Sequence, residues 1–260
     1  MCPMQPEYLI GLVSFFASLL TFFSGFGLGT LLLPVFAMFY DLNSAVLLTA
    51  CVHLLNNVFK FALVYRNINW QKALTFSLFA LPASLFGAWL LGALNNSELN
   101  AAVYKFNNLE LKLSAIKTSL GILMLFFGFW ELFPRAEKFS LAEKWFGIFA
   151  FLSGLIGGFS GHQGALRTIV LSKAKLEKQA FVATGICIAC FVDLARIPVY
   201  VSENSMRNIS MHAILPAVLP AFAGAWLGNR FLMKIEVKWL KWIVGAYLIV
   251  MGALVGLGLI

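Results

Sequence analysis

Charged side chains are scarce in this 260-residue sequence, where Asp, Glu, Lys and Arg make up 12% of the residues. A soluble domain has roughly 25%. No polar stretch is long enough to form a separate soluble domain, and 61% of the residues are hydrophobic. A water-soluble core could not bury so much apolar surface. Because the apolar runs are continuous and not alternating, the sequence predicts an all-α integral membrane protein, with residues 1–260 as a single transmembrane domain.

Several functional motifs are also missing. The glycine-rich stretches lack a Gly-Lys-Ser/Thr ending and follow no strand, which excludes a phosphate-binding P-loop. No cluster of metal ligands and no nucleophile–base arrangement appears, so we expect no metal, no cofactor and no enzymatic activity. The net charge of +8 is assigned to membrane-flanking loops and not to nucleic-acid binding. Cys187-x-x-Cys190 resembles a redox pair, but on a membrane helix such a pair is more often two small packing residues.

The sequence contains two copies of one unit, offset by 136 positions. Repeat one covers residues 7–134 and repeat two covers residues 143–260. In the second copy, Glu143, Gly147, Phe151, Leu155, Phe159, Ser160 and Gly161 match Glu7, Gly11, Phe15, Leu19, Phe23, Ser24 and Gly25. Further along, Cys187 matches Cys51, Asp193 matches Asn57 and Arg196 matches Lys60.

Each unit holds about five hydrophobic segments, and the first two are short and joined by a glycine break. The breaks are Ser24–Gly29 and Ser160–Gly164. The segments of the first unit are 8–23, 30–40, 42–65, 73–94 and 114–133, and those of the second are 145–159, 165–171, 179–201, 212–232 and 239–260. The polar connection 105–117 is expected to be an external loop or a surface helix.

Loop charge indicates how these segments cross the membrane. If each break separates two segments, twelve Lys and Arg residues fall on one side and four on the other. The positive-inside rule therefore favours five segments per unit and both termini outside. One alternative stays open, in which the two short segments of a unit enter the membrane, meet at the glycines and return to the same side. An odd count makes the repeats inverted, and inverted repeats with interrupted helices are typical of transporters.

The two breaks are candidate anion sites. Glycines allow close approach to the backbone, and a helix that starts after a break presents free N–H groups. These arguments select Ser24, Gly25 and Gly27 in the first break and Ser160, Gly161, His162 and Gln163 in the second. Close packing of helices through small residues is the alternative explanation.

Three cations lie inside apolar segments, where a charge usually faces a cavity or a partner. Lys60 and Arg196 hold equivalent places, and Arg167 follows the second break. Asn57 completes the predicted lining. Lys60 could instead reach the membrane surface, and Arg196 could simply pair with Asp193, three residues earlier. Asp193, His53 and His162 are candidates for proton coupling.

The chain resembles the sulfite exporter (TauE/SafE) family of membrane transporters. The residues that carry the likeness are Ser24-Gly-Phe-Gly-Leu-Gly-Thr-Leu-Leu-Leu-Pro34 and Gly154-Leu-Ile-Gly-Gly-Phe-Ser-Gly-His-Gln-Gly164, and the duplicated layout fits as well. His162, Gln163 and Arg167 depart from the usual glycine-rich pattern, which bears on the substrate more than on the fold.

The resemblance implies a multi-pass carrier in the bacterial cytoplasmic (inner) membrane. It would export small sulfur-containing anions, such as sulfite or organosulfonates like sulfoacetate, with protons or another coupling ion. Its partners would be that anion and the lipid bilayer. A passive anion channel, or a membrane-embedded thiol-dependent enzyme that uses Cys187 and Cys190, are the alternatives.

Overall fold

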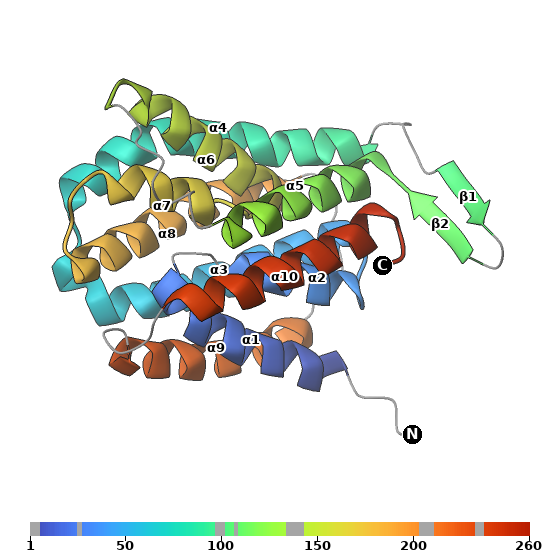
Figure 1. Ribbon diagram of the computed structural model, residues 1–260, viewed down its shortest axis with the longest axis horizontal. Helices are drawn as coiled ribbons and strands as arrows, with labels where there is room; N and C mark the ends of the chain where they lie inside the picture. The colour runs from blue at the N-terminus through green and yellow to red at the C-terminus, as the bar shows by residue number, and fades with distance from the viewer. Residues whose placement is uncertain are drawn as a thin grey trace.

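The computed structural model describes residues 6–24, 28–96, 102–106, 109–133, 143–202, 211–231 and 237–260. Ten α-helices and one hairpin make up this part of the chain (Figure 1). The first half contains α1 (Pro6–Ser24), α2 (Leu28–Ala37), α3 (Leu42–Val64), α4 (Trp70–Asn96) and α5 (Ala115–Leu132). The second half contains α6 (Phe146–Ser160), α7 (Gly164–Ser172), α8 (Lys178–Ser202), α9 (Met211–Phe231) and α10 (Val237–Gly256).

The helices follow the predicted segments one for one, and each predicted break falls between two helices. The described part of α3, α4, α5 and α8 is long and apolar enough to cross a membrane, while α1, α2, α6 and α10 provide shorter apolar stretches. The membrane prediction is confirmed at this level, because continuous apolar runs form helices that satisfy their own backbone hydrogen bonds.

The connection between α4 and α5 was expected to be an external loop or a surface helix, and the surface helix is wrong. Strands β1 (Ala102–Phe106) and β2 (Leu109–Leu113) pair there as an antiparallel hairpin, with Ala102 opposite Leu113. The described chain is therefore helical in its apolar segments and not throughout. The hairpin projects from one end of the helix bundle (Figure 1).

The shortest helices turn back inside the molecule. At about 1.5 Å per residue, α7 is about 14 Å long, roughly half the thickness of a hydrocarbon core. Helix α6 ends where Gly161 adopts φ = 81°, a left-handed conformation that suits glycine, and the Gly161 N–H donates to the Gly157 carbonyl. Helices α6 and α7 pack on each other.

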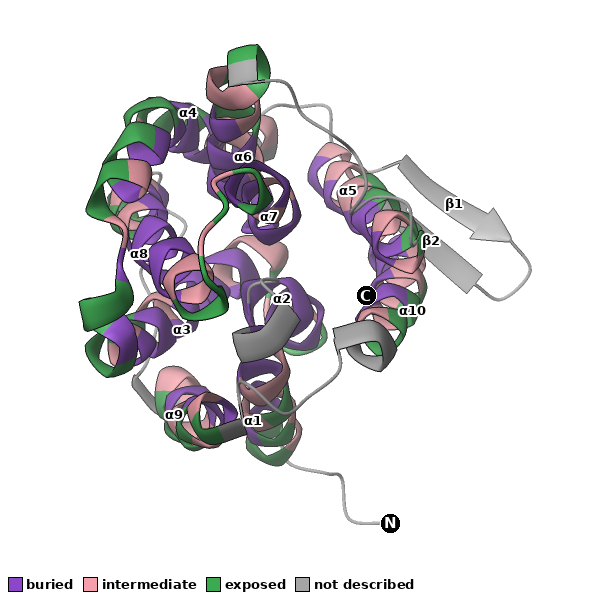
Figure 2. Cartoon of the chain, turned by 60° about the vertical axis from the view of Figure 1, so that its left-hand side comes forward, coloured by how far each residue is buried: buried purple, intermediate pink, exposed green. Residues whose placement is uncertain are grey.

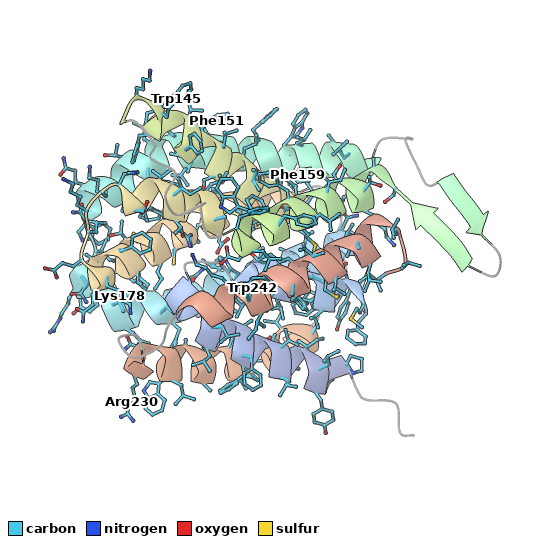
Figure 3. All side chains as sticks on the ribbon, in the orientation of Figure 1. Trp145, Phe151, Phe159, Lys178, Arg230 and Trp242 are labelled. Carbon is cyan, nitrogen blue, oxygen red and sulfur yellow. The ribbon has the colours of Figure 1, made fainter. Side chains whose placement is uncertain are left out.

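Lys178 and Arg230, which the loop analysis assigned to one side of the membrane, lie at the same end of the bundle, called the basic side here. Trp145 lies at this end as well (Figure 3). The start of α1, the end of α10 and the hairpin lie at the opposite end (Figure 1). The pair α1 and α2 starts and ends on the hairpin side, and the pair α6 and α7 starts and ends on the basic side.

Helices of one half pack on helices of the other. Helix α1 packs on α9, α4 on α6, α5 on α10, and α3 on α8. Glycines allow two of these contacts: Gly87 of α4 faces the Leu155 carbonyl, and Gly224 of α9 faces the Phe15 carbonyl, each too closely for a Cβ atom.

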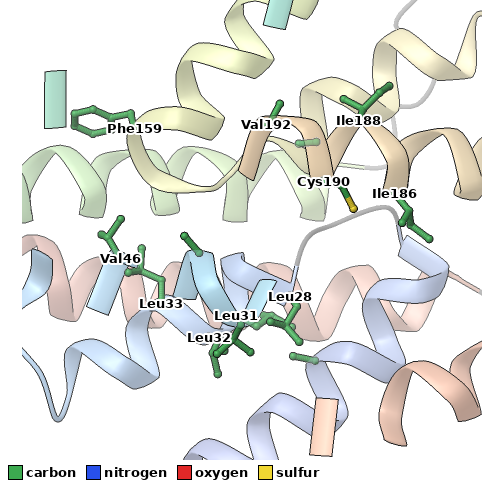
Figure 4. Packing of buried hydrophobic residues seen from close by; sticks show 14 of the residues in the cluster. Leu28, Leu31, Leu32, Leu33, Val46, Phe159, Ile186, Ile188, Cys190 and Val192 are labelled. Atoms are coloured by element: carbon green, nitrogen blue, oxygen red, sulfur yellow. The ribbon is translucent and has the colours of Figure 1, made fainter. Parts of the chain in front are cut away.

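The short helices α2 and α7 lie innermost. Burial colouring shows both almost entirely buried, with the exposed faces on the outer helices (Figure 2). The leucines of α2, among them Leu28, Leu32 and Leu33, contribute to the core together with Ile188 and Val192 of α8 (Figure 4). Both predicted breaks therefore adjoin the most deeply buried helices.

Candidate functional site

A chain of polar contacts joins the two halves of the molecule between α3 and α8. His53 Nδ1 lies 2.6 Å from Asp193 Oδ2, and both side chains are buried. The second carboxylate oxygen of Asp193 accepts a hydrogen bond from Arg196 Nε at 2.9 Å and lies 2.8 Å from Nη2 in an ion pair. The sequence left open whether Asp193 and Arg196 pair, and the structure shows that they do.

The Arg196 guanidinium also holds the end of α6. Its Nη1 donates to the Gly157 carbonyl at 2.8 Å, and the Tyr200 hydroxyl donates to the carbonyl of Gly158. The last carbonyls of a helix lack partners within the helix and carry partial negative charge. Arg196 satisfies one of them, and Asp193 balances its charge. We therefore assign Arg196 a positioning role at the break.

The connection between α6 and α7 is buried and polar. His162 Nδ1 lies 3.0 Å from both the carbonyl and the hydroxyl of Ser160, and the imidazole stacks on Phe127 with ring centroids 6.0 Å apart. The Ser153 hydroxyl donates to the Gln163 carbonyl at 3.0 Å. Within the described chain, His162 Nε2 and both side-chain amide atoms of Gln163 are buried and make no hydrogen bond.

Arg167 lies in the first turn of α7, and 6% of its surface is exposed. Its guanidinium passes over Gly185 of α8, where the Nε atom lies 3.5 Å from the position of a Cβ. Arg167 also lies within electrostatic range of Asp193, His53 and Lys60. The structure thus brings together the second break, the predicted cation after it and the α3–α8 contact.

Lys60 contacts α1 from inside the bundle. Its ammonium donates to the Ser18 carbonyl at 3.3 Å and to Thr21 Oγ1 at 3.2 Å. Only 3% of Lys60 is exposed, so the alternative that its side chain reaches the membrane surface is wrong. Ser18 Oγ lies 3.0 Å from the Asn56 amide, which places a second buried polar group beside the same contact.

The first break is described only at its edges. The backbone of Ser24 ends α1, while Gly25 and Gly27 fall outside the described residues. Gly29, at the start of α2, faces the His53 ring, and the Asn57 amide nitrogen lies 3.2 Å from both imidazole nitrogens. The predicted Asn57 therefore belongs to the α3–α8 contact.

Ser18 and Thr21 are functional candidates that the sequence did not indicate. Both are small hydroxyl residues in an apolar helix, where such residues commonly serve packing. Only their contacts with Lys60 in the structure indicate a functional role. The repeat offers a signal in hindsight, because Thr21 lies 136 positions before Gly157, and Lys60 lies 136 positions before Arg196.

Three cysteines lie on the two helices that meet in this region. Cys187 and Cys190 are buried free thiols of α8, and Cys51 is a free thiol of α3. In the described ranges, no group of three or more His, Cys, Asp or Glu side chains could hold a metal ion.

The comparison with protein families gives one match, which spans nearly the whole chain. The model described as "Sulfite exporter TauE/SafE" matches residues 10–255. No curated protein and no solved structure gives a significant match.

Proposed function

Because the chain belongs to the sulfite exporter TauE/SafE family, we propose that it exports small sulfur-containing anions by alternating access. The substrate class is sulfite or organosulfonates such as sulfoacetate, and the site of action is the bacterial cytoplasmic membrane. The observation that carries this proposal is a buried arginine, Arg167, in the first turn of a helix that begins at a break inside the membrane bundle.

The start of α7 is the anion subsite in this proposal. The first N–H groups of a helix lack intrahelical acceptors and favour negative charge. Arg167 adds a full positive charge on the same turn. The Gln163 amide N–H, which makes no hydrogen bond within the described chain, supplies a neutral donor. A sulfite ion or a sulfonate group presents three acceptor oxygens to such a set of donors.

Lys60 and the first break form the equivalent subsite of the other half. Lys60 lies within electrostatic range of Arg167. Ser24, Gly25 and Gly27, which precede α2 in the sequence, complete this proposed subsite. Two buried cationic groups suit an anion between them, because the charge of each is costly to bury alone.

Inverted repeats provide the mechanism we propose. Repeat one, residues 7–134, and repeat two, residues 143–260, each start with a pair of helices that turns back at a break. Those pairs start from opposite ends of the bundle (Figures 1 and 3). The pairing of α1 with α9 and of α6 with α4 has the exchange symmetry expected of such repeats. Rocking of one unit against the other would expose the site alternately to each side.

A substrate panel in proteoliposomes tests this proposal. Efflux of labelled sulfite, sulfoacetate, isethionate, thiosulfate and sulfate is measured with purified protein and with empty vesicles. The proposal predicts saturable efflux of at least one sulfite-like or sulfonate anion. Efflux that rises linearly with concentration supports the passive channel, and no efflux for any anion contradicts the proposed function.

A further inference from the structure

We propose that His53 carries one proton together with each exported anion, so that acid and anion leave as a pair. This inference rests on the proposed function and adds a co-substrate to it. Its basis is the position of the His53–Asp193 contact, which is the meeting point of both breaks. His53 lies against Gly29 at the start of α2, and Asp193 holds Arg196, which holds the end of α6.

The hydrogen bonds around His53 define how the proton is received. In the neutral ring, Nδ1–H donates to Asp193 Oδ2, and Nε2 can accept from the Asn57 amide, whose nitrogen lies 3.2 Å away. An incoming proton binds Nε2 and makes the ring an imidazolium. Rotation of the Asn57 amide then presents its oxygen to the new N–H. Asn57 therefore accommodates both states of the ring without a change in helix packing.

Charge balance links this proton to the anion. Asp193 and Arg196 neutralise each other within their ion pair. The charge of Arg167 opposes a proton on the His53 ring, and an anion at the start of α7 would cancel that charge. Because uncompensated buried charge is costly, each ligand favours the other, and the coupling is reciprocal. Co-binding of this kind gives symport.

Among the charged and titratable groups near the His53–Asp193 contact, His53 is the one that we assign as the proton carrier. Arg167 of α7, with Arg196, Cys190 and Tyr200 of α8 and Cys51 of α3, act on His53 or Asp193. His162 lies in the α6–α7 connection, where its Nδ1 donates to Ser160, and within the described chain its ring has no carboxylate partner of the kind that Asp193 gives His53. Helices α2 and α6 contain no titratable side chain, and α4 and α9 carry their basic side chains only in their end turns.

The test measures protons per anion with a pH dye inside the vesicles, for wild type and His53→Gln. Glutamine keeps an N–H donor for Asp193 and cannot bind a proton. The probe is isethionate or thiosulfate, whose charge is fixed near neutral pH. If sulfite alone is carried, the difference between the two proteins is used, because the proton on sulfite itself is common to both. Ser77→Ala is the control, since it removes a buried hydroxyl of α4 that makes no hydrogen bond within the described chain.

We expect one proton per anion for wild type and for Ser77→Ala, and one fewer for His53→Gln, which should still exchange labelled for unlabelled anion. The apparent affinity of wild type for the anion should improve by up to about tenfold per pH unit of acidification, and that of His53→Gln should not.

Anion efflux by wild type without proton movement overturns the inference and leaves the proposed function intact. Absence of wild-type efflux removes the proposed function itself. Equal proton counts in wild type and His53→Gln also overturn the inference, and if the variant does not fold, the wild-type count alone decides.

Discussion

Lys60 and Arg196 make matching contacts at the ends of two different helices. Lys60 donates to Thr21 Oγ1 of α1, and Arg196 donates to the Gly157 carbonyl of α6. The two cations are 136 positions apart, and so are their two partners. A third-helix cation therefore holds the first helix of its own half, close to the break, in both halves of the chain.

Arg167 is the cation that we expect to contact the anion. Arg167→Gln removes its charge from the start of α7 and should lower anion affinity at least about thirtyfold, because loss of a buried charged contact costs about 2 kcal/mol or more. Saturation kinetics of efflux measure this effect. Arg66→Gln, at an exposed position, is the matched control. Equal affinities for wild type and Arg167→Gln would remove Arg167 from the site.

The first expected effect of replacing Arg196 is a loss of protein stability. Arg196→Ala leaves the Asp193 carboxylate buried beside His53 without its arginine, and loss of one partner of a buried pair costs about 3–5 kcal/mol. We expect a clear fall in the thermal unfolding midpoint in detergent. Arg196→Met combined with Asp193→Leu should recover much of that loss, because no charge is then left unpaired. A double variant as unstable as Arg196→Ala contradicts this reading.

The contact between α9 and α1 depends on Gly224. Gly224→Ala places a Cβ against the Phe15 carbonyl and should destabilise the protein by about 1–3 kcal/mol, as overpacking does. Gly256→Ala is the control, since its Cβ would meet its nearest neighbour at 3.4 Å, an ordinary contact. Thermal unfolding of the two variants side by side gives the comparison, and similar midpoints would disprove the close approach.

Single cysteines test the predicted orientation. In a variant without the four native cysteines, Lys175→Cys should react only with a thiol reagent that reaches the cytoplasm, and Tyr8→Cys should react from outside in intact cells. Both positions are exposed. Labelling of both positions from the same side contradicts the five-segment arrangement and the inverted repeats.

The sequence predicted the helices well because their signal is local. Continuous apolar runs and glycine breaks mark each helix without reference to distant residues. The hairpin was missed although Leu109-Glu-Leu-Lys-Leu113 alternates apolar and charged residues, which is the period of a strand.

The site was predicted only in part, because its contacts join residues far apart in the sequence. His53 and Asp193 were chosen separately, and their contact spans 140 residues. Lys60 lies six positions before Arg66, which suggested the membrane surface, but Ser18 and Thr21 hold it inside the bundle. Pairing of this kind depends on how helices pack, and no pattern within one helix encodes it.

Trans-acceleration of efflux tests the central claim, transport by alternating access, most directly. Vesicles loaded with a labelled substrate anion are diluted into buffer with or without the same unlabelled anion. Because a carrier returns faster when its site is occupied, the account predicts faster efflux of label when unlabelled anion is outside. Efflux that is unchanged or slowed by external anion at every concentration would contradict alternating access and favour a passive channel.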